Sequence, residues 1–533
     1  MKHLILTLTA VSTLAAYGGD DWISAGKRWW AHIEYLASDA LEGRNVGSPG
    51  YEKAADYVAR EFRGAGLKPG GGLGSYRQPV PFVQIALDES RSSLRVVRDG
   101  HAEKVTLGDE ALLGFSSDSA PHIEAPLVFA GYGLRITEEN YDDLAGLPLK
   151  GAVVVFLTGG PAHIPGNLRS HYSSNEERWK PMREAGAVGV ISILNPASMD
   201  VPWARMAANR GQARMVLADA KLAATPGLQF AATWNPARTD VLFAGTGHSL
   251  DEILKAAAAN QPLPHFATGL RVEADVAIAK SRVNSENLVG VRPGRDPALK
   301  NEYIVVSAHL DHLGVGEPVN GDRIFNGAMD DASGIASLIE IARALKDQRS
   351  RTRRSVVFLA VTGEEKGLLG SRYFTNRPTV SGRIVADINM DMFLPLFPLK
   401  YLEVQGLAES TLGDDIRAVA AASGVEVQAD KEPDRNRFIR SDQYSFIRKG
   451  VPALAFKFGF LPGTPEETIY RNWYAQRYHA VSDDLSQPVD KAAAAQFDAL
   501  LTSLVRRVGN AAKAPEWKPD SFFKRFEDVA PRK

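Results

Sequence analysis

The stretch RSVVFLAVTGEE, Arg354–Glu365, joins a continuous apolar run to a pair of adjacent glutamates. An apolar run without alternation predicts a strand that is buried on both faces of a parallel sheet. Glu364 and Glu365 come where this strand would end. Because adjacent like charges repel, we expect them either to lie in open solvent or to be compensated by nearby positive charge.

From Glu286 onward, strand-like runs alternate with helical patterns. The strand-like runs are NLVGVRPG, EYIVVSAHLDHLG, RSVVFLAVTGEE, RIVADINMDMF, KYLEVQG and VPALAFKF. Between two of them, ASGIASLIEIARALKDQ places Ile335, Leu338 and Ile339 on one face of a helix. This alternation predicts an α/β fold with a mainly parallel mixed sheet flanked by helices. Ligands bind such sheets beyond the carboxyl ends of the strands.

The composition excludes several kinds of partner and site. In 533 residues, 62 lysines and arginines nearly balance 63 aspartates and glutamates, so no overall field favours nucleic acid or an anionic membrane. The chain has no cysteine, which excludes disulfides and thiolate ligands. Any metal ion must therefore be held by nitrogen and oxygen.

The N-terminal stretch MKHLILTLTAVSTLAAYGGDD has the basic start, short apolar run and small residues of a secretory signal peptide. We therefore predict a signal peptide at 1–17. The protein would be exported, either periplasmic or extracellular, without stable membrane insertion after the signal is removed. A buried N-terminal helix is the alternative interpretation.

In the middle of the chain, short strands separated by glycine replace the amphipathic helices of the preceding stretch. This change predicts an inserted, smaller β-rich α/β domain at 121–268, after an N-terminal part of the main domain at 18–120. The main domain would continue through 269–512, with a tail at 513–533. The inserted stretch has scattered histidines but no pair at ligand spacing with a carboxylate, so we expect it to carry no chemistry of its own.

Polar residues collect at the predicted carboxyl ends of the strands, in five separate segments. These residues are His309, Asp311, Asp330, Asp331, Glu364, Glu365, Asp391 and His479. Each has an ordinary explanation by itself; Asp331, for example, could cap the helix that follows it. Together they would concentrate negative charge in one crevice at large electrostatic cost. Two divalent cations, held by two histidines and three carboxylates of which one bridges, would compensate this charge and leave a position for water.

The motifs SAHLDHLG, GAMDDASG, TGEEKGLLGS, NMDM and YHAVSDD, in this order, resemble those of the co-catalytic dizinc aminopeptidases. This family includes secreted leucyl aminopeptidases and aminopeptidase Y, and it is related to glutamate carboxypeptidase. The resemblance implies the zinc exopeptidase fold, which is phosphorylase/hydrolase-like. The inserted stretch is similar to a protease-associated domain.

Carried over residue by residue, the resemblance implies two Zn²⁺ ions per chain and no other cofactor. The implied ligands are His309 and Asp391 on one ion, Glu365 and His479 on the other, and Asp330 on both.

The resemblance also implies roles for residues around the ions. Glu364 would be the general base and acid, and Tyr478 a donor to the oxyanion. Asp311 matches a carboxylate that orients the ligating imidazole of His309 without touching metal. The pattern gives His312 no ligand role.

Two positions depart from the family pattern. Asp331 stands where the family usually has asparagine, which adds a carboxylate next to the site. The segment SDQYSF has Gln443 where a histidine is common. Gln443 is not among the carried-over ligands, so the implied metal site is unaffected.

We therefore expect an exported zinc-dependent aminopeptidase that hydrolyses N-terminal residues from peptide substrates, using a metal-bridged hydroxide with a glutamate general base. A carboxypeptidase or dipeptidase is the alternative enzyme. Arg435, Arg437 and Arg440 could hold a substrate carboxylate in such an enzyme, or they could simply be solvated. A metal-free binding protein on the same fold is an alternative of another class. The sequence leaves side-chain specificity and oligomeric state open.

Overall fold

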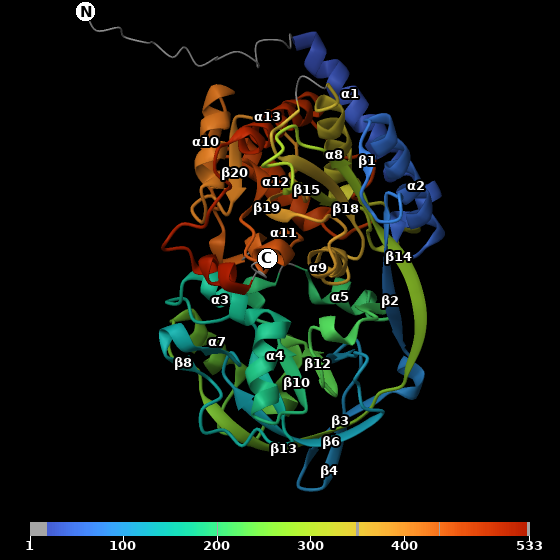
Figure 1. Ribbon diagram of the computed structural model, residues 1–533. Helices are drawn as coiled ribbons and strands as arrows, with labels where there is room; N and C mark the ends of the chain where they lie inside the picture. Colours follow the sequence, from blue (N-terminus) through green and yellow to red (C-terminus); the bar gives the residue numbers. More distant parts are fainter. Residues whose placement is uncertain (1–18, 200, 348–350, 436, 530–533) are drawn as a thin grey trace, which may run out of the picture.

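The computed structural model describes residues 19–529 except 200, 348–350 and 436 (Figure 1). The predicted signal peptide at 1–17 lies outside the described residues. Within the described part of the chain, no helix is both long enough and apolar enough to cross a membrane.

The larger sheet has ten strands, nine of them in one path. In spatial order these are β11 (Arg214–Leu217), β2 (Arg77–Leu87), β14 (Ile278–Arg292), β18 (Ser355–Val361), β15 (Glu302–His309), β19 (Arg383–Asn389), β22 (Ala453–Gly459), β20 (Tyr401–Gln405) and β21 (Glu426–Ala429). The tenth, β1 (Lys68–Pro69), pairs with β14.

The centre of this sheet is parallel. β18, β15, β19 and β22 are neighbours that run in one direction, whereas β2, β14 and β20 join antiparallel at the two sides. Every residue of β18 and β22 is buried, as the continuous apolar runs predict. The predicted fold class, a mainly parallel mixed α/β sheet with a second, smaller unit, is confirmed.

Helices cover both faces of the larger sheet (Figure 1). One face carries α1 (Gly19–Leu36), α2 (Pro49–Gly64), α8 (Ser333–Ala344) and α13 (Lys491–Asn510), and its core includes Trp29, Ile339 and Phe497. The other face carries α9 (Leu369–Asn376) and α11 (Gln443–Ile447), whose Phe374 and Phe446 pack on Val305 and Val357 of the strands. The remaining helices of this unit are α10 (Leu412–Ala422) and α12 (Pro465–Gln476).

The smaller unit is a second sheet with its own core. Its strands, in spatial order, are β4 (His101–Lys104), β3 (Ser93–Arg98), β13 (His265–Asp275), β6 (His122–Ala130), β9 (Val153–Leu157), β10 (Gly189–Ile193), β12 (Phe230–Trp234) and β5 (Ala111–Gly114). Its helices are α3 (Gly166–Ser173), α4 (Asn175–Glu184), α5 (Trp203–Ala208), α6 (Asp240–Phe243) and α7 (Leu250–Ala258). The domain boundaries that the sequence predicts stay a prediction.

Charged and polar contacts join the two units between α4 and α11. The Arg448 guanidinium donates to Glu176 at 2.7 Å and to Glu177 at 3.0 Å. His171, at the end of α3, lies 2.6 Å from the Tyr444 hydroxyl. Because all of these groups are at least partly buried, the two units meet over a packed surface rather than through solvent.

Glu403, on β20, supplies a pH-dependent test of this fold. Burial raises the pKa of this carboxyl group to about 7, and neighbouring Asp430 adds to the shift. Because the pKa of Glu403 is higher in the folded protein than in the unfolded chain, its contribution to the free energy of unfolding is fully present below the ordinary pKa of a glutamate. This contribution is lost as the pH rises through about 7.

We expect Glu403→Gln to raise the melting temperature by a few degrees near pH 8 and to have almost no effect near pH 5. Thermal denaturation followed by circular dichroism measures both values. An equal gain at the two pH values would contradict a titrating Glu403.

Candidate metal centre

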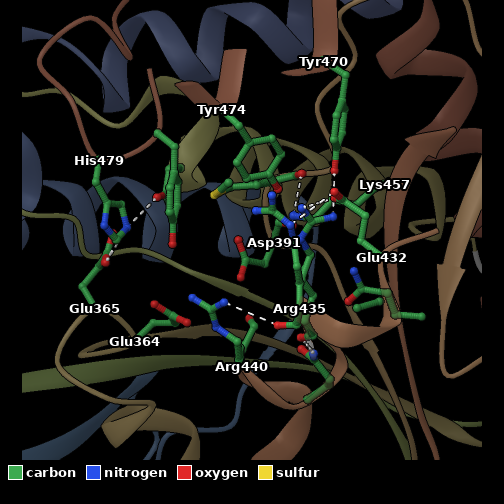
Figure 2. A pocket seen from close by; sticks show the side chains of 18 of the residues that line it. Glu364, Glu365, Asp391, Glu432, Arg435, Arg440, Lys457, Tyr470, Tyr474 and His479 are labelled. Carbon is green, nitrogen blue, oxygen red and sulfur yellow. Dashed lines mark hydrogen bonds and ion pairs between the residues drawn. The ribbon is translucent and has the colours of Figure 1, made fainter. Parts of the chain in front are cut away.

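A cavity of about 500 Å³ lies at the carboxyl edge of the parallel strands (Figure 2). Its lining includes six of the residues singled out from the sequence: Asp330, Glu364, Glu365, Asp391, Tyr478 and His479. This position agrees with the rule that open α/β sheets bind ligands beyond the carboxyl ends of their strands.

Neighbouring strands deliver most of these side chains. His309 is the last residue of β15, Glu364 and Glu365 follow β18, and Asp391 follows β19. Since these three strands are adjacent and parallel, their ends meet at one place. Two segments outside the sheet complete the group: Asp330 comes from the short helical segment η7 (Ala328–Ala332), and His479 from the loop after α12.

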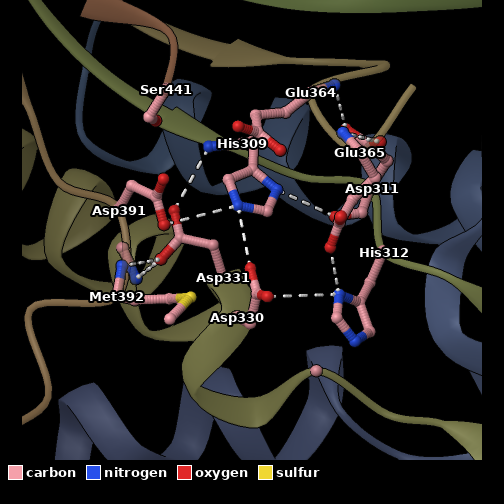
Figure 3. Close-up of polar contacts among 12 residues, drawn as sticks. His309, Asp311, His312, Asp330, Asp331, Glu364, Glu365, Asp391, Met392 and Ser441 are labelled. Atoms are coloured by element: carbon pink, nitrogen blue, oxygen red, sulfur yellow. Dashed lines mark hydrogen bonds and ion pairs between the residues drawn. The ribbon is translucent and has the colours of Figure 1, made fainter. Parts of the chain in front are cut away.

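Four of the implied metal ligands, His309, Asp330, Glu365 and Asp391, fall into two groups that share Asp330 (Figure 3). The fifth, His479, contacts the Glu365 side of the centre. His309 Nε2 lies 3.0 Å from Asp330 Oδ1 and 3.7 Å from Asp391 Oδ1. His479 Nε2 lies 3.2 Å from Glu365 Oε2 and 3.3 Å from Asp330 Oδ2. Asp330 therefore presents one oxygen to each group, as a bridging ligand must.

The atoms of these groups fit two divalent cations. Asp330 Oδ2 and Asp391 Oδ1 are buried, and within the described part of the chain they accept no hydrogen bond. Buried carboxylate oxygens without donors are unfavourable unless a cation faces them. Imidazole nitrogens with carboxylate oxygens form a donor set that suits zinc.

The carboxyl groups of Glu364 and Asp330 differ in pKa. Burial raises the pKa of Glu364 well above its usual range, and the nearby carboxylate of Asp391 adds to this shift against the opposing effect of His309. Burial acts in the same direction on Asp330, but the nearby imidazoles of His309 and His479 hold its pKa well below the usual range. Glu364 therefore holds a proton more readily than the carboxylate between the imidazoles.

Asp311 orients the glutamate pair with its side chain and His309 with its backbone. The Glu364 N–H donates to Asp311 Oδ1 at 3.1 Å, and the Glu365 N–H donates to Asp311 Oδ2 at 3.3 Å. His309 Nδ1 lies 3.0 Å from the backbone carbonyl oxygen of Asp311. This differs from the expected contact between the Asp311 carboxylate and the imidazole, because the side chain turns toward the loop that follows β18.

Asp331, the departure from the family pattern, binds backbone amides. Its carboxylate accepts N–H groups from Gly334 at 2.9 Å, His309 at 3.2 Å and Met392 at 3.3 Å. The bond from Gly334 caps the first turn of α8, and the other two tie the ends of β15 and β19 to it. The added carboxylate is therefore used to hold three segments together.

His312 lies inside the centre, although the sequence analysis gave it no ligand role. It is fully buried, and its Nδ1 lies 2.7 Å from Glu365 Oε1 and 3.9 Å from Asp330 Oδ2. His312, Asp330 and Glu365 form a group that could hold a cation. The available signal was the sequence HLDH, which has a second histidine three positions after His309.

Two other buried residues that the sequence analysis did not single out support Asp330. The Asp483 carboxylate accepts the N–H of Met329 and of Asp330, each at 3.0 Å. The Arg44 guanidinium donates to the carbonyl groups of Leu310, at 2.9 Å, and Gly327, at 3.0 Å. Asp483 belongs to the quoted motif YHAVSDD, but only the tertiary structure brings it to η7.

Tyr478 and Gln443 both line the cavity. The Tyr478 ring stacks on His479 with centroids 4.0 Å apart, and burial raises the pKa of its hydroxyl well above the usual range. The group therefore stays protonated and able to donate. Gln443 instead accepts from Asn389 Nδ2 at 2.7 Å and donates to the Phe438 carbonyl at 2.9 Å.

The smaller unit contacts the loop that carries His479. Arg205, on α5, donates from Nη1 to the Tyr478 carbonyl at 2.9 Å and from Nη2 to the Ala475 carbonyl at 3.5 Å. Met199, also from the smaller unit, lines the cavity. The two units therefore build the cavity together.

Comparison with known proteins relates this centre to peptidases. Residues 287–505 match "Peptidase family M28". The chain is 28% identical over 246 residues to a protein of Aspergillus oryzae named "probable leucine aminopeptidase 2", covering 42% of this chain and 46% of the relative. It is 31% identical over 153 residues to "Aminopeptidase NAALADL1" of Rattus norvegicus, covering 27% of this chain and 18% of the relative. The chain thus spans less than half the length of these curated relatives.

Similarity in fold to a solved structure extends over nearly the whole chain. The solved structure "Aminopeptidase from Aneurinibacillus sp. strain AM-1" superposes with a TM-score of 0.55 at 21% identity. The superposition covers 92% of this chain and 95% of that one. At this identity the similarity concerns the fold alone.

We expect Asp311→Asn to weaken the binding of divalent cations by about ten- to a hundredfold. Asparagine has one oxygen acceptor, and its NH₂ group cannot accept the second backbone amide, so Glu365 would lose its orientation. Competition with a chromogenic chelator measures the zinc affinity. Asp414→Asn, at a side chain that is 62% exposed, is the matched control. Equal zinc affinity in the two variants would contradict this role of Asp311.

We expect Arg205→Gln to weaken the site that contains His479 by about two- to tenfold, because the shorter side chain cannot reach the Tyr478 carbonyl. A zinc titration should show one of two ions released earlier than in the wild-type protein. Arg210→Gln removes a neighbouring charge that pairs with Glu89 instead. If both variants titrate alike, the contact from α5 does not support the His479 loop.

Proposed function

Residues 287–505 of this chain belong to peptidase family M28, and from this premise we propose that the protein is a zinc-dependent aminopeptidase that releases N-terminal residues from peptides. The observation that carries the proposal is the pair of His–carboxylate groups that share Asp330, with Glu364 lining the same cavity. A metal-free binding protein would not need to bury these carboxylates together.

Two Zn²⁺ ions would occupy the centre. The residues that would hold them are His309 and Asp391 for one ion, Glu365 and His479 for the other, and Asp330 for both. When bound, the ions supply Lewis acidity that polarises the scissile carbonyl and lowers the pKa of water.

Glu364 would move the protons of the reaction. Its carboxylate accepts a proton from the attacking water and later delivers it to the departing amine. The bond from its backbone N–H to Asp311 fixes the start of the side chain, so that the carboxylate stays in the cavity.

Two further residues would act on the substrate. The Tyr478 hydroxyl donates a hydrogen bond to the oxygen of the scissile carbonyl as negative charge develops on it. The free α-amine of the substrate lies near Glu365 and His479, which selects the chain terminus. The partners of the protein are therefore peptides with a free N-terminus.

We also propose that the protein is exported, on the basis of the signal-peptide pattern at 1–17. N-terminal sequencing of the mature protein from the periplasm or the medium tests this. Retention of residues 1–17 on a cytoplasmic protein would contradict export.

We expect Glu364→Gln to keep both zinc ions and to lose hydrolysis of aminoacyl nitroanilides by about two to four orders of magnitude. Glutamine keeps the shape of the side chain but cannot accept the proton. Metal analysis and steady-state kinetics on the same sample measure the two effects.

Glu365→Gln is the matched comparison, because it changes the adjacent carboxylate, which contacts His479 and His312. This variant should lose zinc as well as activity. Unchanged activity of Glu364→Gln would remove that residue from the reaction. A zinc-free wild-type protein whose hydrolysis resists chelators would contradict the proposed function as a whole.

A further inference from the structure

A second cavity, of about 230 Å³, lies in the smaller unit, away from the metal centre. Residues of α4 line it together with residues of β9, β10 and β12, the strands beside which α4 lies (Figure 1). One water molecule needs roughly 15 Å³ of such space. The cavity can therefore hold a small organic molecule.

The strands that line this cavity bury one face and leave the other incompletely covered. In β10, Ile191 is buried in the core of the smaller unit, whereas Val190 and Ser192 are half-buried and line the cavity. β12 repeats this alternation, with Ala231 and Thr233 on the side of the cavity. Successive residues of a strand point to opposite faces. The cavity is thus a space that α4 and these small side chains leave open on one face of the sheet.

Arg178, on α4, places a positive charge in the wall of the cavity. It is 6% exposed, and its guanidinium lies 4.4 Å from the centroid of the Phe156 ring. Its Nη1 and Nη2 donate to the carbonyl groups of Ser173, at 2.9 Å, and Gly159, at 3.5 Å. Its Nε is buried and has no hydrogen-bond partner in the described part of the chain. Because a buried charged donor without an acceptor is unfavourable, this Nε–H requires an acceptor.

No carboxylate of the cavity balances the charge of Arg178. The described residues that line the cavity include no aspartate or glutamate. Asp143 acts on Arg178 without forming an ion pair, and its oxygens already contact the Tyr141 hydroxyl, at 2.6 Å, and His265 Nε2, at 2.9 Å. Burial lowers the pKa of Arg178 to about 10, so the group stays protonated at neutral pH.

Arg214, on β11, adds a second guanidinium where the cavity meets solvent. Its side chain is exposed, and its guanidinium lies 4.8 Å from the centroid of the Phe115 ring, which also lines the cavity. Among the described residues it forms no ion pair. Several hydroxyl groups complete the polar part of the lining, namely those of Ser116, Ser119, Ser192 and Thr233.

We propose that this cavity binds a small monocarboxylate with an apolar body, whose carboxylate pairs with Arg178 and Arg214. Guanidinium groups bind carboxylates through charge-assisted hydrogen bonds. The apolar part of the lining, which includes Phe115, Trp179 and Met182, suits a hydrocarbon chain or ring. A phosphate dianion would bring more charge and more acceptor oxygens into a largely apolar space than one buried N–H can compensate. The site is independent of the metal centre and of the proposed function.

Calorimetric titration of the zinc-loaded protein with 4-methylpentanoate, with 4-methylpentanamide and with inorganic phosphate tests the site. The acid and the amide share one hydrocarbon body and differ in charge. We expect the wild-type protein to bind the carboxylate about ten- to a hundredfold more tightly than the amide, and this preference to decline with added salt.

Arg178→Gln should reduce the affinity for 4-methylpentanoate by about tenfold or more, because it removes a buried charge. Arg214→Gln should reduce it by about two- to tenfold, because an exposed charge is screened by solvent. Binding of the carboxylate to zinc would be the same in all these proteins, so the loss relative to the wild type is the readout. Arg183→Gln is the matched control: it removes an exposed charge from α4 outside the cavity and should keep the wild-type affinity.

Ala231→Leu tests the cavity without changing either arginine, because the larger side chain would occupy the space. It should lower the affinity for 4-methylpentanoate by about tenfold or more. Melting temperatures show whether each variant is folded, and if Arg178→Gln does not fold, Arg214→Gln and Ala231→Leu decide. Wild-type affinity in these two variants, or equal affinity of the wild-type protein for the acid and the amide, overturns the site. Tighter binding of phosphate than of the carboxylate overturns the proposed class of ligand.

Discussion

The arrangement of the site depends on burying several carboxylates within a few ångströms of one another. Like charges in a buried crevice repel strongly, so each carboxylate needs its own compensation. Backbone amides supply it for Asp311, Asp331 and Asp483. Asp311 accepts N–H groups from the glutamate pair, Asp331 from two strand ends and the first turn of α8, and Asp483 from η7. Imidazoles supply part of it for Asp330, Asp391 and Glu365, and the remainder matches two divalent cations.

This compensation also makes the centre rigid. Asp331 connects β15, β19 and α8, and Asp483 reaches from the His479 segment to the backbone of Asp330. Arg44 adds a buried guanidinium that holds the backbone carbonyls of Leu310, which follows β15, and Gly327, which precedes η7. Residues that contact no substrate thus place the ligands, and a centre held in this way needs little rearrangement to bind metal.

The cavity around the metal centre is completed by the smaller unit on one hand and by α12 and the segment before α11 on the other. Arg205 and Met199 reach the cavity from the second sheet, so the loop that carries His479 is supported from outside the larger sheet. The opposite wall combines tyrosines of α12 with the arginines before α11. In an α/β fold of this kind, the strand ends supply the chemistry and the surrounding loops select the substrate.

The sequence by itself determined the central strands, the covering helices and the five candidate metal ligands. Continuous apolar runs report burial on both faces, and the polar residues stand within a few positions of the strand ends. Only the tertiary structure decided which atoms meet. The Asp311 side chain turns to the glutamate amides, His312 enters the ligand group, and Asp483 and Arg44 support Asp330. The structure also shows that the arginines from 435 to 440 line the cavity. The sequence could not show this, because periodicity indicates the face on which a residue lies but not which distant segment lies opposite it.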